Sequence, residues 1–171
     1  MGTRRLTLLR HGQAQQAGSD ADDSERPLTR RGAAEAREMA GRILHRNLVP
    51  DLILVSPAER ARATAELVAS ACHIDARHLL CARELYLASA DSIWRLVTRR
   101  HGTPAHVLVC GHNPGLSQLA SRFGPDPRPR DLPTAGLATA VWHGATWGVV
   151  KPETALECDL DDPESLADLW I

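Results

Sequence analysis

The chain has 171 residues, of which 43% are hydrophobic and 24% are charged, and its formal net charge is −1 at pH 7. This length and composition predict a single domain over residues 1–171 with a substantial hydrophobic core. The small net charge argues against a protein dedicated to binding nucleic acid or a membrane surface. Four widely spaced cysteines and the lack of a long apolar run favour free thiols in a reducing compartment, so we expect a cytoplasmic protein.

The first predicted element is a short, mostly apolar run at residues 6–9, typical of a strand buried on both faces. Arg10, His11 and Gly12 follow it directly. Ligands bind at the carboxyl ends of the strands in open α/β sheets. Arg10 and His11 therefore stand where chemistry is expected, and Gly12 allows the backbone to come close to a ligand.

A polar segment at residues 13–26 and an amphipathic helix come next. Its aspartates do not follow a buried strand, as an aspartyl nucleophile usually would, and we interpret the segment as a solvated acidic loop: Asp20, Asp22 and Asp23. Thr29 is the predicted N-cap of the helix, because apolar residues then recur at helical spacing as far as about Asn47.

A second apolar strand is predicted at residues 52–55, and the sequence Ser-Pro-Ala-Glu follows it at residues 56–59. This pattern is typical of a capping box, so we expect a helix with Ser56 as its N-cap. Arg60 and Arg62 lie in the opening turns of that helix, close to the end of the strand.

The rest of the chain continues the alternation of strands and helices. The pattern predicts strands at residues 79–81, 106–110, 137–142 and 146–150, the last two paired as a β-hairpin. It predicts helices at residues 90–100, 114–123 and from residue 162 onward. The helix at 114–123 is expected to use Asn113 as its cap, and Gly111-His112 lies between it and the preceding strand.

Helices that alternate with buried strands predict an α/β fold, a three-layer α/β/α sandwich with a largely parallel central sheet and an antiparallel edge hairpin. In a parallel sheet the carboxyl ends of the strands meet at one edge, which brings together two imidazoles, His11 and His112, and two or three guanidinium groups: Arg10, Arg60 and, as the third candidate, Arg62. Such a pocket suits an anion, and phosphate above all, because arginine forks match its oxygens. An imidazole near neutral pH can also act as nucleophile or acid.

Four motifs in this order resemble the histidine phosphatase superfamily. They are Leu-Leu-Arg-His-Gly at 8–12, Pro-Leu-Thr-x-x-Gly at 27–32, Ser-Pro-x-x-Arg-Ala-x-x-Thr-Ala at 56–65 and Gly-His-Asn-Pro at 111–114. The resemblance spans roughly residues 4–120, and the small size without long insertions is most similar to the SixA-type phosphohistidine phosphatases. It implies a phosphatase that forms a phosphohistidine enzyme intermediate.

The resemblance also implies a role for each matching residue. His11 corresponds to the histidine that is transiently phosphorylated, and Arg10 and Arg60 correspond to the arginines of the phosphate pocket. His112 corresponds to the second histidine, which holds phosphoryl oxygens as a cation. Glu84 is the candidate for the acidic proton donor that many members carry between the motifs that match residues 56–65 and 111–114 here.

The substrate is expected to be phosphohistidine on a protein. Loss of an alkoxide from a phosphate ester requires a proton donor, whereas the imidazole of a phosphoramidate leaves readily once protonated, so weakly matched Glu84 favours the P–N bond. Two alternatives stay open: a phosphomonoesterase or mutase acting on a small phosphorylated metabolite, and a non-catalytic phosphate-binding domain.

Other enzyme classes fit the sequence poorly. No cysteine is followed six residues later by an arginine, which excludes a cysteine phosphatase. His11 and His112 do not belong to a closely spaced histidine pair, so we expect no metal ion, and we expect no other cofactor. Arg62 falls outside the matching arginine position and is expected to be a solvated helix residue.

Overall fold

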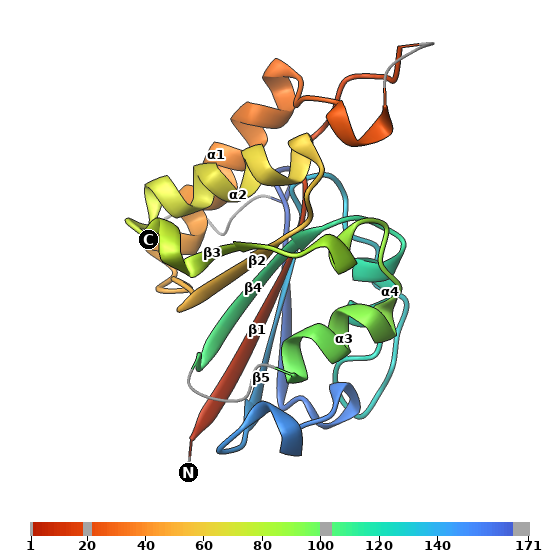
Figure 1. Ribbon diagram of the computed structural model, residues 1–171. Coiled ribbons are helices and arrows are strands. Elements are labelled where there is room, and N and C mark those ends of the chain that lie inside the picture. The colour runs from red at the N-terminus through yellow and green to blue at the C-terminus, as the bar shows by residue number, and fades with distance from the viewer. Residues whose placement is uncertain (1, 19–21, 100–103, 166–171) are drawn as a thin grey trace.

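The computed structural model describes residues 2–18, 22–99 and 104–165. These residues form a six-stranded sheet between two layers of helices (Figure 1). From one edge of the sheet to the other, the strands are β3 (Leu79–Cys81), β2 (Leu52–Val55), β4 (His106–Gly111), β1 (Thr3–Arg10), β5 (Leu137–His143) and β6 (Glu157–Asp161). The predicted three-layer α/β/α architecture is confirmed.

The centre of the sheet is parallel, and one edge is antiparallel. β3, β2, β4 and β1 run in the same direction, whereas β5 is antiparallel to β1 and β6 is antiparallel to β5. β2 and β4 are buried along their whole length because helices cover both faces of the sheet. The carboxyl ends of β1, β2 and β4 therefore meet at one edge.

The predicted hairpin is correct for β5 and wrong for its partner. Residues 146–150 contain a 3₁₀ helix, η4 (Trp147–Val149), and the strand beside β5 is the acidic β6. Trp147 and Val150 are buried while Val149 is exposed. Burial three residues apart fits the three-residue turn of a 3₁₀ helix and not the two-residue alternation of a strand.

Two long helices, α1 (Arg30–His45) and α2 (Glu59–Ala71), cover one face of the sheet. The side chain of Thr29 accepts a hydrogen bond from the Gly32 N–H, so the predicted N-cap is confirmed. The predicted start of the second helix is wrong: α2 begins at Glu59, with Ala58 at the cap position. The Ser56 side chain instead lies against His112, which leaves residues 56–58 as a turn before the helix.

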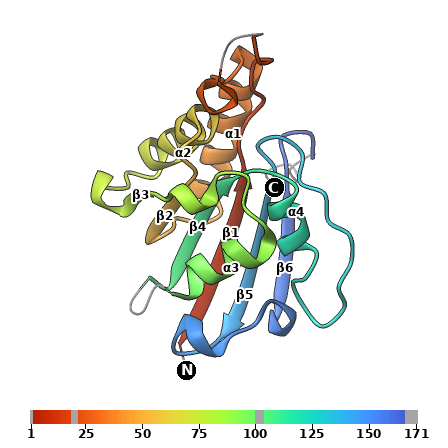
Figure 2. The same cartoon turned by 45° about the vertical axis from the view of Figure 1, so that its right-hand side comes forward.

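The other face is covered by α3 (Ala90–Thr98) and by the short α4 (Gly115–Ala120), as Figure 2 shows. Phe123, Trp142 and Trp147 are almost fully buried there. α4 begins after Pro114 and ends earlier than predicted. Of the helix predicted from residue 162 onward, residues 162–165 form a turn and the rest lies outside the described residues.

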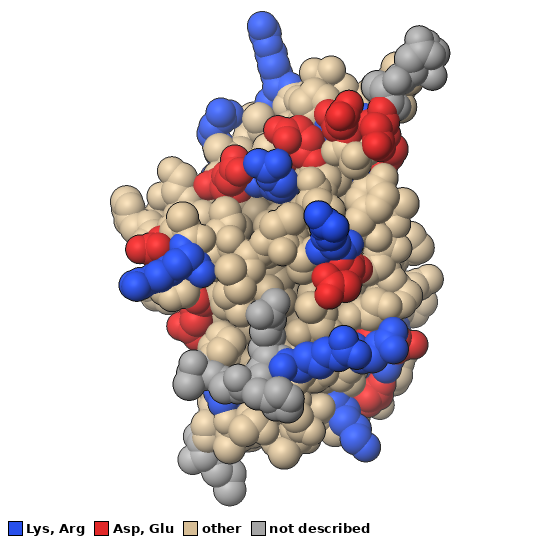
Figure 3. Space-filling view, viewed as in Figure 1, with Lys and Arg blue, Asp and Glu red and all other residues tan. Residues whose placement is uncertain are grey.

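Short 3₁₀ helices connect the larger elements. Besides η4, they are η1 (Asp23–Glu25), η2 (Ala76–His78), η3 (Arg83–Leu85) and η5 (Pro152–Thr154). Acidic and basic side chains are interspersed over the face of the molecule shown in Figure 3. Within residues 2–18, 22–99 and 104–165, no helix is long and apolar enough to span a membrane.

Candidate active site

The strand register brings the two motif histidines together. Arg10 at the end of β1 pairs with Gly111 at the end of β4, and the His11 N–H donates a hydrogen bond to the Gly111 carbonyl oxygen at 3.1 Å. The next residues, His11 and His112, therefore lie side by side, with ring centroids 5.1 Å apart. Arg60, in the first turn of α2 after β2, reaches the same place and contacts His11. The predicted convergence of these four basic residues is seen in the structure.

The imidazole of His11 is held in one orientation and one tautomer. Its Nδ1 lies 2.7 Å from the carbonyl oxygen of Gly12, and because a carbonyl only accepts, Nδ1 carries the proton. Nε2 then keeps its lone pair and faces Arg60 Nε at 3.3 Å. Burial, with a smaller contribution from the nearby arginines, lowers the pKa of His11 to about 4. The imidazole is neutral at pH 7 and has an unprotonated nitrogen, as a nucleophile requires; this Nε2 accepts a hydrogen bond from Arg60 Nε.

The turn after His11 depends on two glycines that touch. A Cβ atom on Gly12 would lie 2.4 Å from the Gly32 carbonyl oxygen, and one on Gly32 would lie 2.0 Å from the Gln13 carbonyl oxygen. The Gly12 N–H donates to the buried Thr64 hydroxyl at 3.0 Å. The first turn of α1 thus fixes the backbone that orients His11, which explains both glycines of the first two motifs.

His112 is only 4% exposed. Its Nε2 lies 2.7 Å from Ser56 Oγ, while its Nδ1 is buried without a hydrogen-bond partner among the described residues. Burial is the main cause that lowers the pKa of His112 to about 3, and His11 and Arg60 lower it further. The resemblance implies a cation here, but with these neighbours the imidazole is neutral at pH 7.

Arg10 and Arg60 are held by backbone carbonyl groups. Arg10 Nη1 donates to the Leu132 carbonyl oxygen at 2.8 Å, and its Nε is buried without a partner among the described residues. Arg60, 4% exposed, donates through Nη1 to the Asp23 carbonyl oxygen at 2.5 Å. The Leu132 carbonyl oxygen also accepts a hydrogen bond from the Asn113 side chain at 3.0 Å, so the loop before β5 closes this side of the site.

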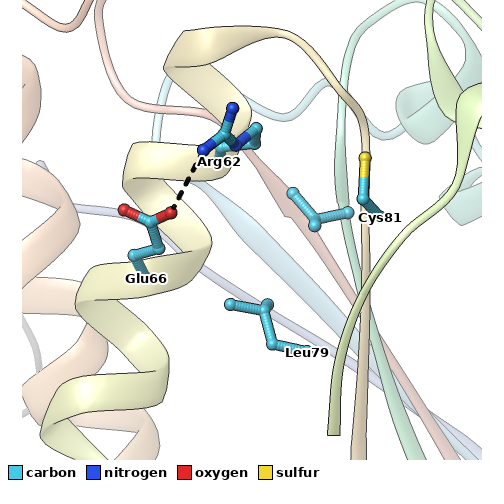
Figure 4. Close-up of a pocket in the computed structure, with 5 residues that line it drawn as sticks. Arg62, Glu66, Leu79 and Cys81 are labelled. Carbon is cyan, nitrogen blue, oxygen red and sulfur yellow. Dashed lines mark ion pairs between the residues drawn. The ribbon is translucent and has the colours of Figure 1, made fainter. Parts of the chain in front are cut away.

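Arg62 does not join this group. Its side chain forms an ion pair with Glu66 at 3.8 Å, one turn further along α2. Both side chains line a separate pocket of about 180 Å³. Figure 4 shows that Leu79 and Cys81 of β3 lie across this pocket from them. The Arg62 side chain is 52% exposed, as expected for a solvated helix residue.

Glu84 lies in η3 and is exposed. No described residue forms a hydrogen bond or ion pair with its carboxylate, so its role as proton donor stays a prediction. Tyr86, two residues further on, does reach the site. Its ring packs edge-on against His112 with a centroid distance of 5.6 Å, and its hydroxyl donates to Asp23 Oδ2 at 2.8 Å.

Asp23, like Tyr86, was not identified from the sequence as a site residue. Its side chain is 42% exposed, as expected for a solvated segment, but it also contacts Arg60. Its Oδ2 accepts from Arg60 Nη2 at 2.9 Å as well as from Tyr86, and its Oδ1 accepts from Arg26 at 2.8 Å. These donors hold the pKa of the carboxyl well below its usual range. Among the described residues, no group of three or more His, Cys, Asp and Glu side chains is arranged to hold a metal ion.

The fold and the site together define a class of protein: an α/β sandwich with two adjacent imidazoles and two arginines where its parallel strands end. The model of the histidine phosphatase superfamily (branch 1) matches residues 6–92. The chain belongs to this superfamily, which implies a phosphatase with a histidine nucleophile.

Two relatives named as phosphohistidine phosphatases support the same assignment. The chain is 31% identical over 137 residues to phosphohistidine phosphatase SixA of Escherichia coli K12, covering 77% of this chain and 81% of SixA. A solved putative phosphohistidine phosphatase SixA from Agrobacterium tumefaciens matches with a TM-score of 0.77 and 30% identity, over 94% of this chain and 99% of that one. The predicted similarity to SixA is confirmed.

A more distant solved structure shows the fold alone. It is a putative α-ribazole-5′-P phosphatase from E. coli K-12, with a TM-score of 0.60 and 23% identity, over 80% of this chain and 90% of that one. The same sandwich thus also occurs in a putative phosphatase of a small phosphorylated molecule.

Proposed function

We propose that this protein removes phosphate from phosphohistidine on another protein, through a phosphohistidine intermediate on His11. The observation that carries the proposal is the fixed tautomer of His11, in which Nδ1 is protonated on the Gly12 carbonyl oxygen and the unprotonated Nε2 accepts a hydrogen bond from Arg60 Nε. The similarity to two SixA proteins supports the choice of substrate class.

The reaction has two transfers, both at His11 Nε2. In the first, the Nε2 lone pair attacks phosphorus in line, a P–N bond to His11 forms, and the P–N bond of the substrate breaks. The departing imidazole takes a proton from solvent and leaves neutral. In the second, water attacks the phosphorus, the bond to Nε2 breaks, and inorganic phosphate is released with His11 restored.

The surrounding basic groups stabilise the transferring phosphoryl group. Arg10 and Arg60 supply two guanidinium groups, and Arg60 Nε lies 3.3 Å from the attacking nitrogen. A phosphate dianion beside His112 raises the pKa of that imidazole, which favours the cation that the resemblance implies. These groups together supply the positive charge that a metal ion provides in other phosphatases, so we propose that turnover is metal-independent.

A phosphohistidine substrate fits the lack of a fixed carboxylic acid among the described residues of the site. Asp23 is ionised and its oxygens accept three hydrogen bonds, while Glu84 is exposed. An alkoxide leaving group needs a proton donor worth about 10²–10⁴-fold in rate, whereas an imidazole that has been protonated from solvent leaves without a donor from the enzyme. His11 is partly exposed, so a side chain on another protein can reach it.

The test compares substrates and one variant of the nucleophile. We expect the wild-type protein to turn over a phosphohistidine protein faster than a sugar phosphate. Dialysis against a chelator should leave the rate of turnover unchanged. His11→Ala should lose turnover while keeping its thermal melting curve, and rapid quench with labelled substrate should trap phosphate on wild-type His11.

Several results would contradict the proposal. A preference for the sugar phosphate, with a hundredfold loss of ester hydrolysis in Glu84→Gln, would instead support a phosphomonoesterase of small molecules. Phosphate binding without any turnover would support a binding domain. Activity lost to the chelator and restored by one divalent ion would exclude metal independence.

A further inference from the structure

Each of the three guanidinium nitrogens of Arg60 contacts a different atom. Nε faces His11 Nε2 at 3.3 Å, Nη1 donates to the Asp23 carbonyl oxygen at 2.5 Å, and Nη2 donates to Asp23 Oδ2 at 2.9 Å. One residue, Asp23, therefore holds both terminal nitrogens. This contact sets which edge of the guanidinium is turned toward the nucleophile.

Asp23 is itself held from two further directions. Its Oδ2 accepts the Tyr86 hydroxyl at 2.8 Å, and its Oδ1 accepts Arg26 Nη1 at 2.8 Å. Asp22, the preceding residue, caps η1 through its own carboxylate, which accepts the Ser24 N–H at 3.0 Å. Donors from the end of the polar segment, from α2 and from the chain after η3 thus fix one carboxylate.

We propose that Asp23 is a positioning residue for phosphoryl transfer, which aims the Nε edge of Arg60 at the phosphoryl group on His11, with Tyr86 keeping the Asp23 carboxylate in place. This inference rests on the phosphatase function proposed above. Asp23 acts through Arg60 and does not touch the reacting atoms.

The arrangement predicts opposite effects on turnover and on phosphate binding. Without the carboxylate, Arg60 keeps its charge and the bond from Nη1 to the backbone carbonyl oxygen of residue 23, but it loses the Nη2 contact that helps to fix its orientation. Small errors in such geometry cost about 10²-fold in rate. The carboxylate is also an anion that competes with phosphate for Arg60. Removal of the carboxylate should therefore lower kcat and strengthen the binding of inorganic phosphate. General damage to the site would instead lower kcat and weaken the binding of phosphate.

The experiment measures kcat and the Kd of inorganic phosphate in the full chain, the latter by calorimetry. Asp23→Ala should lower kcat about 10- to 100-fold and lower the Kd of phosphate. Asp23→Asn, which keeps a neutral acceptor for Tyr86 and Arg60, should recover part of kcat. Tyr86→Phe should show a smaller loss than Asp23→Ala. Asp22→Asn, which keeps the cap of η1, is the matched control and should behave as wild type.

The choice of substrate separates positioning from proton donation. We expect the same fold-loss with an aryl phosphate, which has a good leaving group, and with a phosphohistidine protein. A loss confined to substrates with a poor leaving group would make Asp23 a proton donor and overturn the inference. Unchanged kcat in Asp23→Ala and Asp23→Asn would also overturn it, as would weaker phosphate binding in both. A wild-type protein that binds phosphate but turns over neither substrate would overturn the proposed function, and with it any role of Asp23 in turnover.

Discussion

Arg60 and Arg62 lie two residues apart on α2 and have different surroundings. The Arg60 side chain is 4% exposed and contacts His11 and Asp23, whereas the Arg62 side chain is 52% exposed and pairs with Glu66. Positions two apart on an α-helix point in nearly opposite directions, because each residue advances the helix by about 100°. The pair therefore offers a matched test of what a guanidinium does at the site.

Arg60→Ala should lower kcat by a factor on the order of 10²–10³, because it removes a donor aimed at the transferring phosphoryl group. Arg62→Ala should leave kcat unchanged, because its side chain lies over the separate pocket beside β3. Steady-state kinetics with an aryl phosphate measures both. Equal losses in the two variants would mean that the effect comes from overall charge and not from the position of Arg60.

At the scale of single residues, the sequence was sufficient for side chains that directly follow buried strands. Arg10, His11 and His112 could be placed together because parallel strands end at one edge. Asp23 could not, because its partners Arg60 and Tyr86 lie 37 and 63 residues further along the chain and its own segment has no periodic pattern. Only the folded chain shows that contact.

At the scale of elements, α1 contains two glycines in contrasting environments. A Cβ atom on Gly32 would lie 2.0 Å from the Gln13 carbonyl oxygen, whereas one on Gly41 would have no atom within 4 Å. Residue 32, in the first turn of α1, must therefore lack a side chain so that the backbone after His11 can pack against it. Gly41 has no such requirement.

Gly32→Ala should reduce the free energy of unfolding by about 1–3 kcal/mol, because the added methyl group clashes with backbone that cannot move away freely. It should also reduce kcat, because the shifted turn changes the orientation of His11. Gly41→Ala should increase the free energy of unfolding by about 0.5–1 kcal/mol through helix propensity and leave kcat unchanged. Urea unfolding with parallel kinetics checks both. A neutral Gly32→Ala would show that the contact between α1 and the turn is not required.

The predictability of the other elements followed their hydrophobic pattern. The apolar strands β1, β2 and β4 were recognised because they are buried on both faces. β6 was missed because acidic residues are rare in strands. Its carboxylates are paired with α1: Asp161 with Arg42 and Arg46, and Asp159 with Arg46. This stabilisation depends on tertiary contacts that no local pattern reveals.

At the scale of the whole molecule, buried histidines make stability depend on pH. Burial is the main cause that lowers the pKa of His11 and His106 to about 4 and that of His112 to about 3, from an ordinary value of 6.5. As the pH falls below about 6.5, these histidines therefore begin to bind protons in the unfolded chain but not in the folded chain. Their contribution to stability is complete above that pH and is lost progressively toward pH 4 and below.

We expect the free energy of unfolding to fall on acidification from pH 7 to pH 5, by up to about 1.4 kcal/mol per pH unit for each such histidine. His106→Gln should show a smaller decrease, since it removes one of these groups away from the active site. His78→Gln, which changes an exposed histidine, should match wild type. Urea unfolding at several pH values gives the slope. The same slope in His106→Gln and wild type would contradict this account.

The central position of β1 has a consequence for how the chain folds. β1 pairs with β4 on one side and β5 on the other, and the Thr7 side chain bonds to His106 and Thr139, 99 and 132 residues away in sequence. Pairing with such distant partners requires the closure of long loops, and the entropy lost in that closure comes before any stabilisation from the paired strands. Folding is therefore slower in proteins with many non-local contacts. On the ribosome, β1 leaves the exit tunnel long before either partner has been synthesised. The hydrogen bond from the His11 N–H to Gly111 of β4 can therefore form only after most of the chain has been made.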